Sequence, residues 1–364
     1  MFKNLPLVLI LFIAVASCKP EADVAVTEKK PEVKNIIFLI GDGMGVSQIY
    51  AGMTANKGPL ALEKCQHIGF IKTYSSTHYT TDSAAGGTAF SCGKKTKNGI
   101  IGMDPDSTSL KTILEIAEEH GLSTGLISTS AITHATPASF IAHEVSRYNY
   151  EEIAADFLDT DIDLFIGGGK DHFADREDGR DLVKELEDNG YTVLNSMEEI
   201  EHFAGDKLAG FTANGHNPRY SEGRDNMLPL SVETATRVLS QNKKGFFLMV
   251  EGSMIDWGGH DNNTDYIVEE MLDFDRAIAA ALDFAEKDGK TLVVVTADHE
   301  TGGMAVQGGD FQTGQVRAAY TTKSHTGVMV PVFAYGPGAE TFIGIYENTG
   351  IFTRFTELFR FELQ

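Results

Sequence analysis

The chain has 364 residues, with 52 Asp and Glu against 30 Lys and Arg, which gives a formal net charge of −22. Its length allows a large hydrophobic core, and an apolar fraction of 42% excludes disorder as a general description. We expect no nucleic-acid partner, because binding a phosphate backbone requires Lys and Arg to replace its counterions. The acidity either serves solubility alone, or some of the carboxylates hold metal ions.

Residues 1–17 have the pattern of a signal peptide for export. A charged start precedes an apolar run at 5–16, which is shorter than the roughly 20 residues of a membrane-spanning helix. Two small residues stand directly before Cys18, as in a bacterial lipobox, and predict that Cys18 becomes a lipidated N-terminus. An ordinary signal peptide with an incidental cysteine is the alternative. We expect residues 18–33 to be a flexible tether that anchors a lipoprotein to a membrane of the bacterial cell envelope, facing the periplasm or the cell surface.

The remaining residues, 34–364, alternate between apolar runs and helical patterns, with no repeat and no change of composition. Runs typical of buried parallel strands occur at 35–40, 123–129, 163–166, 246–250, 291–296 and 330–334. Helical patterns occur at 110–119, 181–189, 231–241 and 266–287, and the apolar stretch 352–361 is a further candidate helix. The alternation predicts a single α/β domain with three layers, in which helices cover both faces of a large, mostly parallel central sheet.

Only two cysteines remain in this domain, Cys65 and Cys92. Neither lies in a CxxC pattern, which makes a cysteine-based metal site improbable. They could pair in an oxidising compartment, but we expect two separate buried thiols, because free cysteine is among the most buried residue types.

Acidic residues and histidines follow the predicted strands at the ends where such sheets bind ligands. Asp42 stands among glycines after the first run, but their spacing does not fit a dinucleotide-binding loop. Glu251 follows the run 246–250. Asp256 and His260 are four residues apart, so a helix would place both side chains beside one ion.

Two further strand ends carry the same residue types. Asp298 and His299 follow the run 291–296 and can share an ion only if the strand has already ended, because neighbouring strand residues point to opposite faces. His325 precedes the last run. Carboxylates mixed with imidazoles suit zinc, whereas a subset with oxygen ligands alone suits magnesium. Structural calcium is the alternative, but it prefers oxygen ligands and leaves three histidines unexplained.

A nucleophile is available in Ser83, which small residues follow in Asp82-Ser83-Ala84-Ala85-Gly86-Gly87. These residues can begin a helix close to the sheet, where backbone N–H groups and the helix dipole favour an anion. A bound metal can replace the general base that a serine nucleophile needs. The alternative is that Ser83 only caps the helix.

Together these motifs resemble the bacterial alkaline phosphatase family over about residues 35 to 345. The shared strings are Ile40-Gly41-Asp42-Gly43-Met44-Gly45, Thr81-Asp82-Ser83-Ala84-Ala85, His134-Ala135-Thr136-Pro137-Ala138, Glu251-Gly252-Ser253, Asp256 to His260, Asp298-His299-Glu300-Thr301-Gly302-Gly303 and His325-Thr326-Gly327.

The resemblance implies two Zn²⁺ and one Mg²⁺. One zinc takes Asp256, His260 and His325; the second takes Asp42, Asp298, His299 and the Ser83 oxygen; the magnesium takes Asp42, Thr136 and Glu251. Arg147 falls where the family places its phosphate-binding arginine, and its alternative is a surface arginine. The implied reaction is hydrolysis of small phosphate monoesters through a phosphoserine on Ser83, in an enzyme that is commonly a homodimer.

Three positions depart from the best-known bacterial pattern. His134 stands where some relatives have Asp, so the magnesium site is expected to be weaker or to accept zinc. Trp257 flanks the phosphate where others carry Lys or His, which removes a polar contact. Residues 304–323 are short for a segment that often carries a large crown insert, so the site is expected to be open.

Other functions are compatible with parts of the same pattern. Phosphodiesterases share the metal frame but more often have Thr as the nucleophile, and sulfatases modify a residue in a string that neither Ser83 nor Cys92 heads. A surface lipoprotein that binds phosphate or metal without turnover is the alternative from a different class.

Overall fold

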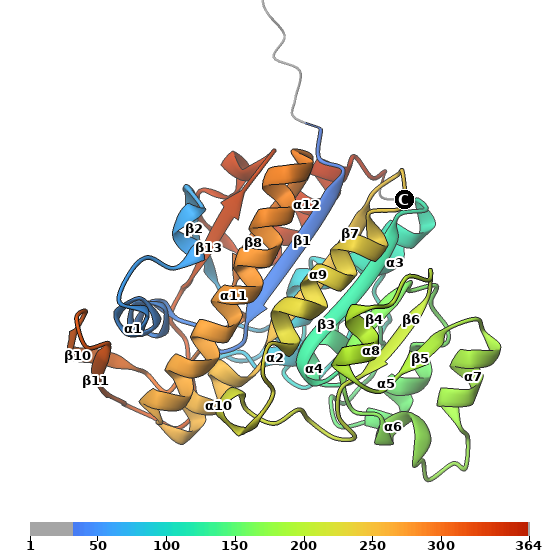
Figure 1. Ribbon diagram of the computed structural model, residues 1–364, viewed down its shortest axis with the longest axis horizontal. Helices are drawn as coiled ribbons and strands as arrows, with labels where there is room; N and C mark the ends of the chain where they lie inside the picture. The colour runs from blue at the N-terminus through green and yellow to red at the C-terminus, as the bar shows by residue number, and fades with distance from the viewer. Residues whose placement is uncertain (1–31, 363–364) are drawn as a thin grey trace, which may run out of the picture. The chain divides into compact units, whose positions relative to one another are not determined.

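A ten-stranded sheet forms the centre of the computed structural model, which describes residues 32–362 (Figure 1). The predicted signal peptide, Cys18 and nearly all of the predicted tether lie outside the described residues. The strand order is β14-β2-β13-β8-β1-β7-β3-β4-β6-β5, and every neighbouring pair is parallel except the two that β13 makes. The strands are β1 (Asn35–Gly41), β2 (His67–Lys72), β3 (Ser123–Ala131), β4 (Leu164–Gly168), β5 (Thr192–Leu194), β6 (Leu208–Phe211), β7 (Phe246–Gly252), β8 (Thr291–Thr296), β13 (Val330–Tyr335) and β14 (Gly344–Glu347).

Helices cover both faces of this sheet, as the alternating pattern predicts. Phe38 of β1 packs against the rings of Phe90 in α2 and Phe355 in α12, whereas Gly41 approaches Phe274 of α11 on the opposite face. Figure 1 shows α9 and α11 side by side in front of the sheet. The helices are α1 (Val46–Asn56), α2 (Ser83–Cys92), α3 (Ile113–Glu119), α4 (Ala135–Ala138), α5 (Tyr150–Asp156), α6 (Asp171–Ala174), α7 (Leu182–Asp188), α8 (Met197–Glu201), α9 (Met227–Leu239), α10 (Met254–Asp261), α11 (Thr264–Asp288) and α12 (Gly350–Phe359).

The predicted elements all occur, with three differences of detail. The run at 330–334 is β13, which is antiparallel to both neighbours, although it has the continuous apolar composition of a parallel strand. β7 continues to Gly252, so Glu251 lies inside this strand rather than after it. β2, β5, β6 and β14 were not predicted, because each is short or interrupted by glycine.

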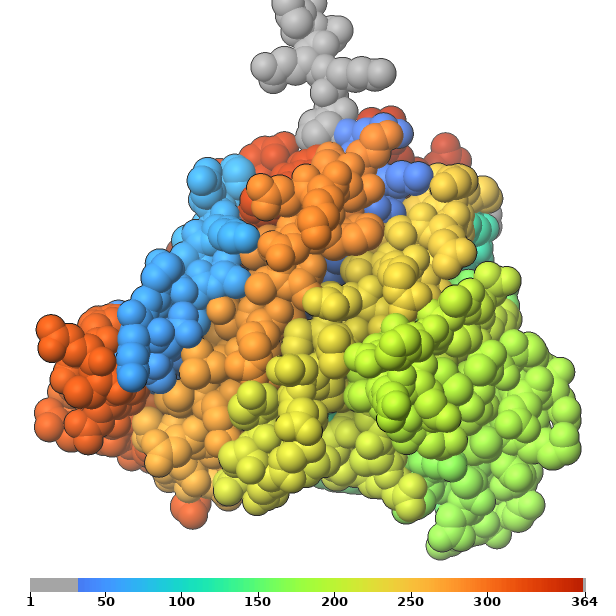
Figure 2. All heavy atoms as spheres, in the orientation of Figure 1, coloured from blue at the N-terminus to red at the C-terminus, as the bar shows by residue number. Residues whose placement is uncertain are grey.

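The short segment 304–323 forms a small hairpin beside α1. Its strands, β10 (Ala305–Asp310) and β11 (Gln315–Ala319), are antiparallel. Phe311 at the turn lies with its ring centroid 6.1 Å from that of Tyr50 in α1. The hairpin lies at the surface (Figure 2), so the short crown insert is a two-stranded hairpin at the edge of the domain.

The two cysteines of the domain are separate buried thiols, as expected. Burial raises the pKa of Cys65 and of Cys92 to about 12, which leaves both protonated and unreactive at neutral pH. Within residues 32–362, no helix combines the length and the apolarity that crossing a bilayer requires.

Candidate active site

The carboxyl ends of the central strands meet at one edge of the sheet. Ile40 of β1 lies opposite Glu251 of β7 and Thr296 of β8 in parallel register. Asp42 directly follows β1, and Asp298 lies two residues beyond β8. The strand pairing therefore brings three carboxylates from distant parts of the sequence to the same level.

Ser83 is the first residue of α2, and its side chain faces this edge. Its Oγ lies 3.3 Å from Asp42 Oδ2 and 3.4 Å from His299 Nε2. The helix is capped by Asp82, whose side chain accepts a hydrogen bond from the N–H of Ala85. The interpretation of Ser83 as the cap is therefore wrong, and its hydroxyl is free for other contacts.

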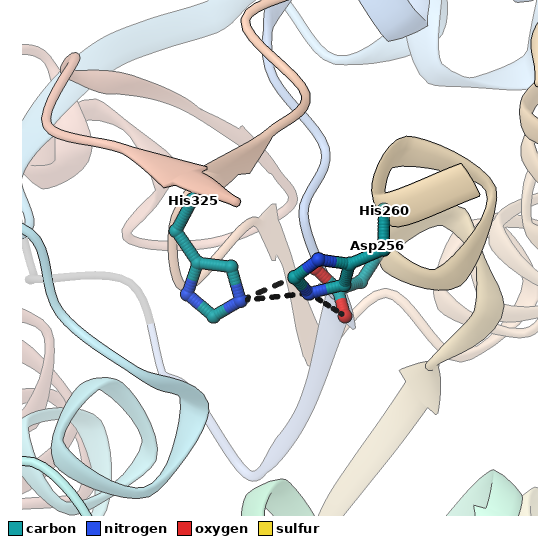
Figure 3. A group of neighbouring side chains, drawn as sticks. All are labelled: Asp256, His260 and His325. Carbon is teal, nitrogen blue, oxygen red and sulfur yellow. Dashed lines mark hydrogen bonds and ion pairs between the residues drawn. The ribbon is translucent and has the colours of Figure 1, made fainter. Parts of the chain in front are cut away.

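Asp256, His260 and His325 form a first group of potential metal ligands (Figure 3). The segment that carries Asp256 and His260 is helix α10, so the four-residue spacing does place both side chains together. His325 comes from β12 (His325–Thr326), which pairs with β9 (Glu300–Thr301). The Nε2 atoms of the two histidines are 3.2 Å apart, and lie 3.3 and 3.5 Å from the carboxylate oxygens of Asp256.

A second group surrounds His299 and is almost entirely buried. His299 Nε2 lies 3.1 Å from Asp298 Oδ2 and 3.3 Å from Asp42 Oδ1, because β8 has ended before both Asp298 and His299. The rings of His299 and His325 stack with centroids 3.5 Å apart. Ligand atoms of Asp42, Asp256 and His299 also lie within 4.8 Å of one another, so Asp256 adjoins both groups.

Backbone carbonyls fix the orientation of two of these imidazoles. His260 Nδ1 lies 2.7 Å from the carbonyl oxygen of Lys323, and His325 Nδ1 lies 2.9 Å from that of Thr81. A carbonyl only accepts hydrogen bonds, so Nδ1 carries the proton in both rings. Their Nε2 atoms therefore face Asp256: they donate to its carboxylate when the rings are protonated, and they offer lone pairs to a cation when the rings are neutral.

Four carboxylates of this region, Asp42, Glu251, Asp256 and Asp298, are buried, and the half-buried Arg147 lies beside them. Burial and the charge of Asp298 raise the pKa of Asp42 well above its ordinary value. Burial acts on Asp256 in the same direction, but the hydrogen bond from His260 and the other histidine charges outweigh it and hold the pKa of Asp256 low. Buried negative charges require paired cations, so the donor set fits metal ions.

Three residues of the predicted magnesium site each have one buried side-chain oxygen that lacks a hydrogen bond in the part of the chain that the structure describes. Asp42 Oδ1, Thr136 Oγ1 and Glu251 Oε1 have no hydrogen-bond partner among the described residues. The other oxygen of Glu251 accepts hydrogen bonds from the hydroxyls of Ser128 and Ser253, at 2.6 and 2.7 Å, which fix the carboxylate. Oxygen ligands of this kind suit a hard cation such as Mg²⁺.

Arg147 lies at the start of α2 rather than on the surface, with its side chain 13% exposed. Its Nη1 donates to Asp82 Oδ2 at 3.1 Å, and Nη2 lies 3.4 Å from His134 Nε2. Burial, together with the charge of Arg147, lowers the pKa of His134 to about 3, which keeps this imidazole neutral. The Nε of Arg147 has no hydrogen-bond partner within residues 32–362, so this N–H remains as a donor for an anion.

Trp257 lies in a small aromatic cluster that also includes a histidine the sequence did not single out. His216 makes edge-to-face contacts with Trp257 and His134, at centroid distances of 5.0 and 5.5 Å. His216 Nδ1 accepts a hydrogen bond from the N–H of Ala131 at the end of β3. Only its position on a loop after a strand could have indicated it, and that signal is weak.

Comparisons with known proteins identify the family of the chain. A family profile described as Alkaline phosphatase matches residues 33–319. Alkaline phosphatase 3 of Bacillus subtilis is 36% identical over 441 aligned residues, covering 96% of this chain and 95% of that protein. The alkaline phosphatase of the Antarctic bacterium TAB5 has 43% identity and a TM-score of 0.86, covering 91% of this chain and all of that one.

A TAB5 variant with a histidine replaced by glutamate and Mg bound in its M3 site has 42% identity and a TM-score of 0.87, covering 92% of this chain and 100% of that one. The match extends over nearly the whole described domain and includes the fold that positions the site. The chain therefore belongs to the alkaline phosphatase family, whose members are metal-dependent phosphoric monoester hydrolases.

Proposed function

We propose that the chain hydrolyses small phosphate monoesters through a phosphoserine on Ser83, at a site that holds two Zn²⁺ and one Mg²⁺. The observation that carries the proposal is the position of the Ser83 hydroxyl, which lies between Asp42 and His299 at a helix start already capped by Asp82. A hydroxyl in that place can approach a phosphoryl group while the helix N-terminus faces the anion.

The proposed ligands of the three ions are those that the family resemblance implies, and the groups described above support them. One Zn²⁺ would be held by Asp256, His260 and His325, the second by Asp42, Asp298, His299 and Ser83, and the Mg²⁺ by Asp42, Thr136 and Glu251. When bound, these ions supply Lewis-acid stabilisation of charge on the reacting oxygens and make the serine hydroxyl and water better nucleophiles. Magnesium bound in the M3 site of the TAB5 variant supports a third site in this fold.

Side chains of the protein orient the nucleophile and bind the phosphoryl group. Asp42 Oδ2 accepts the hydrogen bond of the Ser83 hydroxyl and orients Oγ toward phosphorus. Arg147, held by Asp82, binds the non-reacting phosphoryl oxygens, because its planar fork matches two oxygens at once. The Ser83 Oγ–P bond forms as the P–O bond to the alcohol breaks; water then attacks phosphorus and releases phosphate and the serine hydroxyl.

Rapid-quench kinetics with p-nitrophenyl phosphate test this role of Ser83. Ser83→Ala should abolish the burst of phosphorylated enzyme and nearly all turnover. Ser91→Ala is the matched control, since Ser91 is a buried serine of the same helix whose hydroxyl donates to the carbonyl of Ser139. A wild-type burst in Ser83→Ala would refute the assignment.

Two further measurements address the alternatives. A phosphodiesterase would show the higher kcat/KM on a matched diester, whereas we expect the monoester to be preferred. A binding protein without turnover would retain zinc but release no p-nitrophenol. Family membership favours the monoesterase over both.

The proposed setting is the bacterial cell envelope, with a homodimer tethered through lipid on Cys18. The lipobox-like sequence before Cys18 supports the lipid anchor, and the family resemblance supports the homodimer. Cys18→Ala should move the protein from the membrane to the soluble fraction, and light scattering of the protein without residues 1–18 should give twice the chain mass. Unchanged membrane association or a monomer mass would contradict the respective part.

A further inference from the structure

The loop between β6 and α9, residues 212–226, brings a histidine to the edge of the site. The ring of His216 meets the indole of Trp257 at a centroid distance of 5.0 Å and an interplanar angle of 87°, and the ring of His134 at 5.5 Å and 86°. Trp257 and His134 also meet edge-to-face, at 6.3 Å. Each ring therefore contacts both of the others in a geometry that aromatic pairs prefer.

These three rings connect the first group of potential metal ligands to Arg147. Trp257 directly follows Asp256 in α10. His134 Nε2 lies 3.4 Å from Arg147 Nη2. The ring cluster thus joins the helix that carries two of the ligands to the arginine that we propose binds phosphate.

The tip of the loop is attached to the ends of two sheet strands. The N–H of Gly169, just after β4, donates to the carbonyl oxygen of Gly215 at 2.6 Å. A Cβ at Gly168 would overlap that same carbonyl oxygen, so the close approach requires glycine there. The N–H of Ala131, at the end of β3, donates to His216 Nδ1 at 3.0 Å. Both the backbone and the ring of the histidine are therefore held by the sheet.

A buried arginine attaches the following part of the loop to α10 and α11. The side chain of Arg224 is only 1% exposed. Its Nη1 donates to the carbonyl oxygen of Pro218 at 3.2 Å and lies 3.2 Å from the sulfur of Met254, the first residue of α10. Its Nη2 pairs with Asp273 of α11 at 2.8 Å and with Glu270 of the same helix. The loop is therefore held on both sides of its histidine.

His216 itself is exposed, so burial in the core does not explain why its loop is fixed so firmly. A fixed backbone lets an exposed ring keep one orientation, because little conformational freedom remains to be lost. The arrangement is thus suited to hold the neighbouring indole of Trp257 in place.

We propose that His216 is a positioning residue of the phosphate site. By packing against Trp257, its ring holds the indole against His134. Asp82 then holds Nη1 of Arg147 while the ring cluster supports Nη2. Without the His216 ring the indole can rotate away, and the guanidinium loses one of its two supports. The inference rests on the proposed role of Arg147 in phosphate binding.

Fluorescence tests the position of the indole directly, because the chain has a single tryptophan. His216→Asn keeps an acceptor for the N–H of Ala131 but removes the ring. It should raise the acrylamide quenching constant and shift the emission to longer wavelength. His216→Phe keeps the ring but removes the acceptor, and should be quenched as wild type is. A role of His216 limited to its hydrogen bond predicts the reverse order.

Phosphate binding gives a second readout in the same variants. In His216→Asn the Ki of inorganic phosphate and the KM of p-nitrophenyl phosphate should rise together by about 2- to 10-fold, the range that one aromatic pair contributes, and kcat should change less. His216→Phe should keep the wild-type Ki. His202→Ala is the matched control, because the side chain of His202 is 75% exposed and its carboxylate partner is the neighbouring Glu201. It should change neither readout.

Unchanged quenching in His216→Asn would overturn the proposal, and raised quenching with an unchanged Ki would overturn its link to phosphate. A wild-type enzyme that hydrolyses no p-nitrophenyl phosphate would instead refute the proposed function. The two failures are distinguishable, because the quenching comparison does not depend on turnover.

Discussion

Asp82 caps α2 and also contacts Arg147, the proposed phosphate-binding residue, so replacing it should affect both stability and phosphate binding. Its carboxylate accepts hydrogen bonds from the N–H of Ala85 at 3.0 Å, from the N–H of Gly99 at 2.9 Å and from Arg147 Nη1 at 3.1 Å. Asp82→Ala removes all three. Asp82→Asn keeps a good helix cap and one acceptor oxygen but loses the charge.

The expected magnitudes follow from these contacts. Loss of a helix cap costs about 1 kcal/mol, and hydrogen bonds to a charged group contribute about 1.5 to 3 kcal/mol each. Because the Asp82 side chain is 18% exposed, water replaces part of the loss. We expect Asp82→Ala to lower the free energy of unfolding by about 2 to 4 kcal/mol, and Asp82→Asn by about half of that.

Arg147 should also bind phosphate less tightly without its partner. Without Asp82 the Arg147 side chain must be ordered when the anion binds, at an entropic cost of about 0.5 to 1.5 kcal/mol. The Ki of inorganic phosphate should therefore rise about 2- to 10-fold in Asp82→Ala. Urea unfolding of the metal-loaded enzyme and phosphate inhibition of p-nitrophenyl phosphate hydrolysis measure the two effects. Unchanged stability and unchanged Ki in Asp82→Ala would refute the reasoning, and equal stability of the Ala and Asn variants would refute its capping part.

Metal removal, the half-buried Glu118 and the two thiols give three more predictions. Chelation should lower the melting temperature, since an ion present at 1,000 times its Kd stabilises by about 4 kcal/mol; calorimetry that shows no change, or no recovery with Zn²⁺ and Mg²⁺, would contradict this. Burial raises the pKa of Glu118 to about 7, so its contribution to stability is present below about pH 4.5 and is lost as the pH rises through 7. Glu118→Gln should therefore be more stable than wild type by about 1 to 3 kcal/mol at pH 8 and equal to it at pH 4.5 in urea unfolding, with the exposed Glu119→Gln as control. Cys65 and Cys92 should react with a thiol reagent only after unfolding, and rapid labelling of the native enzyme would show that their burial is incomplete.

The sequence was sufficient for the layers of the fold and for the types of residue in the site. Long apolar runs identify the central strands because those strands are buried on both faces. The same property hides the direction of β13, since a strand buried on both faces has one composition whether it is parallel or antiparallel. The edge strands β5 and β14 are only 3 and 4 residues long, too short for a periodic pattern.

The details of the site depended on contacts that no spacing reveals. Asp82 and Ser83 are neighbours, and the side chain of either could cap a helix. Only the structure shows that Asp82 is the cap of α2 and that the Ser83 hydroxyl contacts Asp42 instead. His216 and Thr301 belong to a loop and to a very short strand, and each forms a hydrogen bond with a residue more than 40 positions away in the sequence.

These distant partners explain why the site can be built largely from loops. Two of the three imidazoles are held through Nδ1 by a carbonyl from another segment, that of Lys323 for His260 and that of Thr81 for His325. The orientations of these two rings are therefore set when the segments dock on the sheet, before any cation binds. A substitution that moves the backbone at Lys323, just after the hairpin of β10 and β11, would rotate His260 without touching a ligand. The short hairpin therefore leads directly into the segment whose carbonyl orients one imidazole of the site.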